Sequence, residues 1–282
     1  MTGKTLPYSD LFLEEMSRGN AEVAGAFGGN IHLGYWDDLD RPDLSFEGFK
    51  KASERFNLEM FRQVDLSKPS RILDVGCGYG GTISDLNRRG ENLQLVGLNI
   101  DPRQVARASA EVAPLAKGSN TIEFVVGDAC ELQFPSNSFD YVFAIDCISH
   151  FASRQRFFSE AHRVLKPQGK LICTEIFLHD GFVSMLGLVA LYCRRGLALR
   201  RVNGKAVMPY TKSRGIAVVK RCGFSVLNAR DINQNMLPGY EFLRVLAKGN
   251  KELEAIERGY RFVEIARKRN YLIGEILELQ KI

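Results

Sequence analysis

The residues best suited to chemistry lie in and beside a glycine-rich turn. Asp74 is followed by the segment Gly76–Gly81, which places four glycines within six positions. Glycines at such a turn let a ligand lie on the backbone and allow positive φ angles. A carboxylate just before the turn suits a cationic amino group better than a pyrophosphate, which dinucleotide-binding turns hold. The sequence therefore predicts a ligand cradle that includes Asp74, Gly76, Cys77 and Gly78.

Four further polar residues follow apolar stretches that are predicted as strands: Asn99, Asp128, Asp146 and His150. An imidazole has an unperturbed pKa of about 6.5, so His150 is suited to removing a proton from a bound molecule near neutral pH. A purely structural role is the alternative for a single histidine. Asp101 is predicted to cap the helix that begins at Pro102.

Predicted strands and helices alternate from Arg71 onward, which favours an α/β fold with a doubly wound, mostly parallel sheet. In such a sheet the ligand lies at the carboxyl ends of the strands, where these polar residues fall. The predicted strands are Arg71–Val75, Leu93–Leu98, Thr121–Val126, Asp140–Ile145, Lys170–Phe177, Gly223–Val226 and Tyr271–Leu279. The predicted helices are Ser45–Val64, Pro102–Val112, Arg154–Leu165, Tyr210–Cys222 and Leu253–Arg269.

Three segments resemble class I S-adenosylmethionine (SAM)-dependent methyltransferases. The turn resembles their D-x-G-x-G-x-G motif, Gly127-Asp128-Ala129 their adenine site, and Arg163–Ile172 their R-V-L-K-P-G-G-x-L element. Asn30–Trp36 is similar to the N-terminal segment of small-molecule methyltransferases of the tocopherol, sarcosine-dimethylglycine and natural-product group. The resemblance implies a Rossmann-like seven-stranded sheet, mostly parallel with one antiparallel C-terminal strand, plus an N-terminal helical cap and an inserted lid.

The resemblance also implies roles for individual residues. Tyr35 would contact the methionine end of SAM, Asp74 the methionine moiety, Asn99 the ribose, and Asp128 the adenine. Family members carry Asp or Glu at the position of Asn99, whose amide has one accepting oxygen in place of two. The full predicted SAM set is Tyr35, Asp74, Gly76, Cys77, Gly78, Asn99, Ile100, Gly127, Asp128, Ala129 and Ile145. The predicted acceptor set is Asp146, His150, Met185 and Tyr192, with His150 as the base and no metal ligand.

The predicted function is methyl transfer from SAM to an N, O or C atom of a small-molecule acceptor by in-line attack. An NAD-dependent oxidoreductase and a SAM-binding regulator without catalysis are the alternatives. No nucleic-acid partner is expected, because neither N-P-P-Y nor D-P-P-Y stands where Asp146–Ser149 is found.

The chain is predicted to form a single domain over residues 1–282. Its parts are a cap (1–65), a SAM-binding core (66–180), an inserted lid (181–210) and the C-terminal part of the core (211–282). Glycines 181, 187, 196 and 204 are predicted to permit lid motion. From Gly181 to Arg230 there are ten Lys and Arg residues and no acidic residue. This basic window predicts a solvated face, an anionic acceptor, or peripheral contact of the lid with an anionic membrane.

Six widely spaced cysteines without a C-x-x-C pair suggest reduced thiols, and the N-terminus lacks an apolar secretory signal. A cytoplasmic location is therefore expected. The oligomeric state does not follow from the sequence.

Overall fold

A seven-stranded sheet forms the centre of the protein, in the order β3-β2-β1-β4-β5-β7-β6. The computed structural model describes residues 7–203 and 208–282, and the side chains of 194–203 are left aside. The strands are β1 Ser70–Val75, β2 Leu93–Asn99, β3 Thr121–Val126, β4 Phe139–Ala144, β5 Leu165–Leu178, β6 Phe224–Asp231 and β7 Leu272–Lys281. Strands β1 to β5 pair in parallel, whereas β7 is antiparallel to both of its neighbours. The predicted fold class is confirmed.

Helices cover both faces of the sheet, because its strands are apolar on each side. One face packs against α6 Arg154–Val164 and α8 Lys212–Arg221, and the other against α3 Phe46–Phe61, α4 Gly81–Arg89 and α5 Pro102–Glu111. In β1, Leu73 and Val75 pack on the face covered by α6 and α8, and Ile72 packs on the opposite face. All three side chains are fully buried. This two-sided burial fixes the end of β1, from which the glycine turn emerges.

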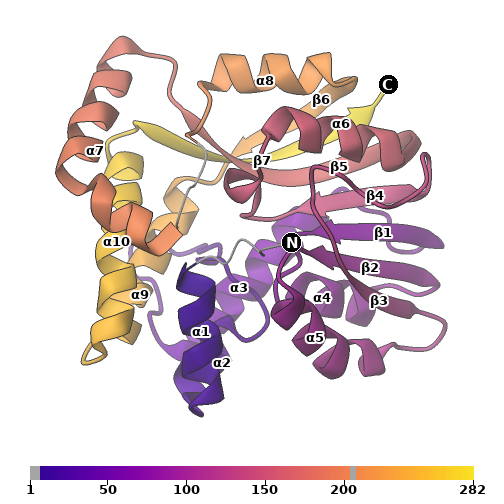
Figure 1. Cartoon of the computed structure of the whole chain (residues 1–282), viewed down its shortest axis with the longest axis horizontal. Helices are drawn as coiled ribbons and strands as arrows, with labels where there is room; N and C mark the ends of the chain where they lie inside the picture. The colour runs from indigo at the N-terminus through magenta and orange to yellow at the C-terminus, as the bar shows by residue number, and fades with distance from the viewer. Residues whose placement is uncertain (1–6, 204–207) are drawn as a thin grey trace.

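A further layer of helices, separate from those on the two faces of the sheet, lies beyond the carboxyl ends of the parallel strands (Figure 1). It contains α1 Pro7–Ser17, α2 Ala21–Phe27, α7 Phe182–Asn203, α9 Leu237–Ala247 and α10 Lys251–Lys268. Aromatic packing joins this layer to α3, since the rings of Phe49 and Phe242 stack with centroids 4.1 Å apart. Helix α9 was not predicted from the sequence. The helices α9 and α10, from the range predicted as C-terminal core, thus pack with the N-terminal helices.

Short 3-10 helices and a capped helix N-terminus lie between the main elements. The 3-10 helices are η1 Ala113–Leu115, η2 Ile148–His150 and η3 Gln234–Met236. Asp101 caps α5 as predicted, accepting from the backbone N–H of Arg103, but it is buried and also binds the Arg103 guanidinium. A carboxylate at this position also interacts favourably with the positive, N-terminal end of the helix dipole.

The predicted lid is largely one helix, α7. Its Leu188 and Leu191 are buried against α10 and β7, and Met185 is exposed. The partly exposed ring of Tyr192 lies 6.2 Å from the ring of Phe262 on α10. Gly187 is needed for close packing and is not a hinge, because a Cβ there would lie 2.3 Å from the ring of Tyr271. Gly204 and Lys205 lie outside the described residues.

In the described part of the basic window, individual cations have acidic partners. Lys212 pairs with Glu275, and Arg230 pairs with Glu59; both glutamates are buried. These two cations therefore compensate buried carboxylates, one on β7 and one on α3. In the part of the chain that is described, no helix combines the length and apolarity that a bilayer crossing requires.

Candidate active site

The glycine turn after β1 has the backbone geometry that the sequence predicts. Gly76, Gly78 and Gly80 have φ angles of 76°, 56° and 87°, in the region that glycine adopts freely. The N–H groups of Gly76 and Cys77 both donate to the carbonyl of Leu98, at 2.7 and 3.1 Å. The turn is thus tied to the end of β2, and its open side faces away from the sheet.

Asp74 is a buried carboxylate beside this turn, only 2% exposed. Its Oδ2 atom has no hydrogen-bond partner among the described residues. Burial raises the pKa of Asp74 to about 7, and a hydrogen bond from Thr82 opposes this rise. A buried oxygen without a donor is costly, so Asp74 is poised to receive a cationic ligand.

The ends of β2 and β3 meet next to the turn. The N–H of Gly127 donates to the carbonyl of Asn99 at 3.0 Å. The Asn99 amide donates to Gln104 Oε1 at 2.9 Å, and its oxygen accepts from the N–H of Asp101 at 3.1 Å. Gln104 in turn donates to Ser9 of α1. The amide nitrogen and the amide oxygen of Asn99 therefore both have hydrogen-bond partners within the protein. The contact of Asn99 with ribose stays a prediction.

The other predicted SAM residues lie around the same strand ends. Asp128 is exposed and accepts from the N–H of Cys130 at 2.8 Å, while Ala129 is buried. Ile100 is largely exposed, and Ile145 is half-buried after β4. Their contacts with adenine or ribose stay predictions.

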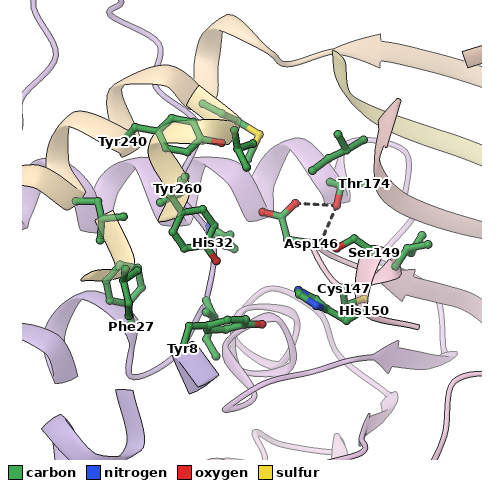
Figure 2. A pocket seen from close by; sticks show the side chains of 18 of the residues that line it. Tyr8, Phe27, His32, Asp146, Cys147, Ser149, His150, Thr174, Tyr240 and Tyr260 are labelled. Carbon is green, nitrogen blue, oxygen red and sulfur yellow. Dashed lines mark hydrogen bonds between the residues drawn. The ribbon is translucent and has the colours of Figure 1, made fainter. Parts of the chain in front are cut away.

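A cavity of about 120 Å³ opens next to the end of β4 (Figure 2). By the usual size of a water site this volume holds roughly ten water molecules. Its polar lining includes Asp146, Ser149, His150, Thr174, Glu175, Tyr8, Tyr240, Tyr260, His32 and Arg267. Figure 2 shows Tyr240 and Tyr260 across the cavity from Cys147 and His150.

Asp146 enters the cavity from a strained position. Its φ of 49° is unusual for a residue other than glycine. The hydroxyl of Thr174 donates to its carboxylate at 3.0 Å and accepts from its backbone N–H at 2.7 Å. Burial raises the pKa of Asp146, and the charge of Arg267 partly offsets this rise. Strained backbone of this kind is concentrated at functional sites.

Cys147 joins the glycine turn to the cavity. A Cβ at Gly76 would lie 2.7 Å from the Cβ of Cys147, and the Cys147 thiol is 3.1 Å from the carbonyl of Val75. Because Cys147 also lines the cavity, one residue separates the two spaces. A ligand in the cradle and a molecule in the cavity would therefore be neighbours.

His150 is a neutral, half-buried imidazole in this cavity. Its Nδ1 atom has no hydrogen-bond partner in the described part of the chain. Burial, with a smaller effect of Arg154, lowers the pKa of His150 to about 4. The ring of Tyr8 lies 5.8 Å away between centroids, which places α1 over the site. His150 can accept a proton, but it is a weaker base than free imidazole.

Three residues that were predicted to bind a ligand do not line the cavity: Tyr35, predicted to contact SAM, and Met185 and Tyr192, predicted to contact the acceptor. The ring of Tyr35 lies 5.6 Å from the guanidinium carbon of Arg55, outside the cavity lining. Met185 is exposed on α7, and Tyr192 packs against Phe262 of α10 outside the cavity lining. Their roles in binding stay predictions.

Several lining residues were missed by sequence reasoning, notably Tyr8, Tyr240, Tyr260 and Arg267. In α10 a signal was present: Ile256, Tyr260, Val263 and Arg267 are spaced at four, three and four residues. Arg267 thus continues an inward-facing helical stripe. In the described part of the chain, no group of three or more metal-ligating side chains is gathered.

The sheet order, with a glycine turn after β1 and an antiparallel β7, defines the class I SAM-dependent methyltransferase architecture. The residues also fit SAM. Asp74 offers an unpartnered oxygen to its ammonium group.

Comparison with known proteins supports the same class. Residues 73–173 match the family model described as a methyltransferase domain. A sterol 24-C-methyltransferase of Gibberella zeae is 32% identical over 66% of this chain and 47% of that relative. The 27-O-demethylrifamycin SV methyltransferase of Amycolatopsis mediterranei is 28% identical over 87% of this chain and 85% of that relative. The chain spans about half of the length of several curated relatives that it matches.

Among solved structures, a putative sarcosine dimethylglycine methyltransferase from Galdieria sulphuraria has a TM-score of 0.76 at 21% identity. That alignment covers 97% of this chain and 98% of the other, and it supports the fold alone. The chain carries a class I SAM-dependent methyltransferase domain, and SAM is the cofactor of this domain.

Proposed function

We propose that the protein transfers a methyl group from SAM to an N, O or C atom of a small-molecule acceptor held in the cavity. The observation that carries this proposal is the shared wall at Cys147, which puts the cradle and the cavity side by side. Relatives that methylate carbon and relatives that methylate oxygen both match the chain, so the acceptor atom is left general.

SAM supplies an activated methyl on sulfur, so the protein's part is to bind, align and exclude water. We assign Asp74 to the ammonium group of the methionine moiety, Asn99 to the ribose, and Asp128 to the adenine. The cavity is largely walled by apolar and aromatic side chains, which favours a lipophilic acceptor over a free amino acid.

We propose that His150 or Asp146 removes the proton from the acceptor. His150 is unprotonated at neutral pH because its pKa is near 4, and its Nδ1 is unpartnered. Burial raises the pKa of Asp146, which makes its carboxylate a stronger base than an ordinary aspartate. An amine acceptor would need neither group.

The test is incubation of the protein and SAM with a panel of amines, phenols, carboxylates and prenyl lipids. A product heavier by one methyl group, with stoichiometric release of S-adenosylhomocysteine (SAH), supports methyl transfer. Binding of SAM with no SAH released from any acceptor favours the regulator, and retention of NADH in place of SAM favours the oxidoreductase.

Replacing His150 by alanine is expected to lower kcat by about 10²-fold for an O or C acceptor if this imidazole takes the proton. For an amine acceptor the rate should stay within a few-fold. Rates with both acceptor types across pH 5–9 measure this, and His162→Ala, on α6 outside the cavity lining, is the matched control. An unchanged rate with a phenol acceptor would remove His150 from the reaction and leave Asp146.

Two further parts of the proposal concern where the protein works. We propose a cytoplasmic location, supported by six free thiols. We also propose contact of α7 with an anionic membrane, supported by the exposed side chains Phe182, Val183 and Leu186. Cosedimentation with anionic vesicles tests this contact, and recovery of all the protein in the supernatant would contradict it.

A further inference from the structure

Arg267 of α10 is a buried arginine that lines the acceptor cavity. It is only 2% exposed and is the largest fully buried side chain of the described residues. Within those residues no carboxylate oxygen comes within 4.0 Å of its nitrogens, and its Nε has no hydrogen-bond partner. Guanidinium groups stay charged in proteins, and burying a charge without a partner costs several kcal/mol.

The groups that hold Arg267 are neutral. Its Nη1 donates to the Oδ1 of Asn233 at 3.0 Å and contacts the sulfur of Met236 at 3.5 Å. Asn233 Nδ2 donates in turn to the Arg267 carbonyl at 3.2 Å. The N–H of Gly274 donates to the same Oδ1 at 3.3 Å. Asn233 therefore orients the guanidinium without compensating its charge.

Among the other ionisable groups of the cavity, Asp146 interacts electrostatically with Arg267 but forms no ion pair with it within 4.0 Å. Glu175 forms an ion pair with Arg154 at 3.0 Å. The Asp146 carboxylate accepts from the hydroxyl of Thr174. His32 and His150 both have a pKa near 4, because burial disfavours their charged forms. One guanidinium is left without a direct counter-charge.

The rest of the wall beside Arg267 is apolar or phenolic. Tyr240, Ile256, Tyr260 and Val263 line the cavity from α9 and α10, and Phe12 and Phe27 from α1 and α2. Such a wall binds a hydrophobic body, and a guanidinium fork matches a planar, singly charged carboxylate. A dianion is less suitable, because Asp146 lines the same cavity.

We infer that the acceptor is a lipophilic molecule bearing a carboxylate, and that Arg267 binds this carboxylate while the cavity wall holds the apolar body. The inference rests on the proposed function, because it treats this cavity as the acceptor site. The methylated atom then lies toward Cys147, and the carboxylate lies toward α10.

The experiment compares 4-phenylbutanoate with its neutral amide, 4-phenylbutanamide, by calorimetry in the presence of SAH. The unchanged protein is expected to bind the carboxylate at least tenfold more tightly. Arg267→Met should abolish this preference, and Arg267→Lys should reduce it, because an ammonium keeps the charge without the fork. The matched control is Arg261→Met on the same helix, because the Arg261 guanidinium pairs with Glu257 outside the cavity. This variant should keep the preference for the carboxylate over the amide.

A missing preference in the unchanged protein, or a preference that survives in a folded Arg267→Met variant, overturns the inference. If Arg267→Met does not melt cooperatively, the unchanged protein and Arg267→Lys still decide between the outcomes. SAH affinity and SAH release are measured in parallel. A carboxylate preference without methyl transfer to any acceptor contradicts the proposed function alone, and methyl transfer to neutral acceptors without a preference contradicts this inference alone.

Discussion

Replacing Asp74 by asparagine is expected to weaken the binding of SAM and SAH by roughly 10- to 100-fold, since a hydrogen bond to a charged group contributes about 1.5–3 kcal/mol. The Oδ2 of Asp74 is buried without a partner among the described residues, and asparagine keeps the shape but cannot offer a charged oxygen to an ammonium group. Thermal stability of the ligand-free protein should be unchanged or higher. Calorimetric titration with SAH and a melting curve measure the two quantities.

The same residue predicts a pH dependence of cofactor binding. The pKa of Asp74 is about 7 in the folded protein against 3.8 for the free side chain. The ligand-free fold therefore loses stability as the pH rises from about 4 to about 7, where the unfolded chain ionises first. The α-amino group of the cofactor is protonated below about pH 7.7. Affinity for SAH should thus fall by up to about tenfold per pH unit below pH 7.

The control for both measurements is Asp65→Asn, at an exposed carboxylate outside the cradle. It should leave the SAH affinity and its pH dependence unaltered. An Asp74→Asn variant that keeps the same slope of affinity against pH would show that another group titrates. Unchanged affinity in that variant would place the ammonium group elsewhere.

The cradle could be predicted from the sequence because it is local. A buried strand, a carboxylate and four glycines lie within eleven residues, Arg71 to Gly81, and the fold follows from strands and helices that alternate along the chain. The predicted element boundaries differ from the observed ones by a few residues, apart from the early start of β5 and the length of β6. Parallel pairing then brings Asn99 and Gly127 to the same edge without any further information.

The acceptor cavity could not be predicted in this way, because its wall comes from segments far apart in the chain. Tyr8, Asp146, Thr174, Tyr240 and Arg267 meet only after the helices have packed. No local spacing shows which member of such a set faces inward.

The helix α7 illustrates a related difficulty. It is apolar on more than one side, so its sequence does not tell which side is buried. Leu188 and Leu191 are buried, and Tyr192 packs against Phe262. Neither Met185 nor Tyr192, chosen from the sequence, lines the cavity. In the segment before α3, Ile31, His32 and Leu33 line the cavity and Tyr35 turns to Arg55.

Replacing Glu175 by glutamine is expected to lower the melting temperature by roughly 10 °C. Glu175 and Arg154 are 3% and 2% exposed, and their ion pair is 3.0 Å long. Removing one partner of a buried pair costs about 3–5 kcal/mol, because the other charge stays buried. For a chain of this size each kcal/mol shifts the melting temperature by about 2–4 °C. Scanning calorimetry measures the shift.

A matched control is Glu254→Gln, which breaks the exposed pair with Arg258 and should change stability by less than about 1 kcal/mol. The double variant Glu175→Leu with Arg154→Met separates two causes. If the loss comes from an orphaned guanidinium, this apolar pair should recover most of the stability. If it comes from the hydrogen bonds that Arg154 and Glu175 make to the backbone of Met208 and Ile176, the double variant should melt as low as the single one. A single variant that melts within about 2 °C of the unchanged protein would contradict both explanations. It would mean that the start of α6, and with it His150, is held in place by the apolar packing of Phe157 and Ala161.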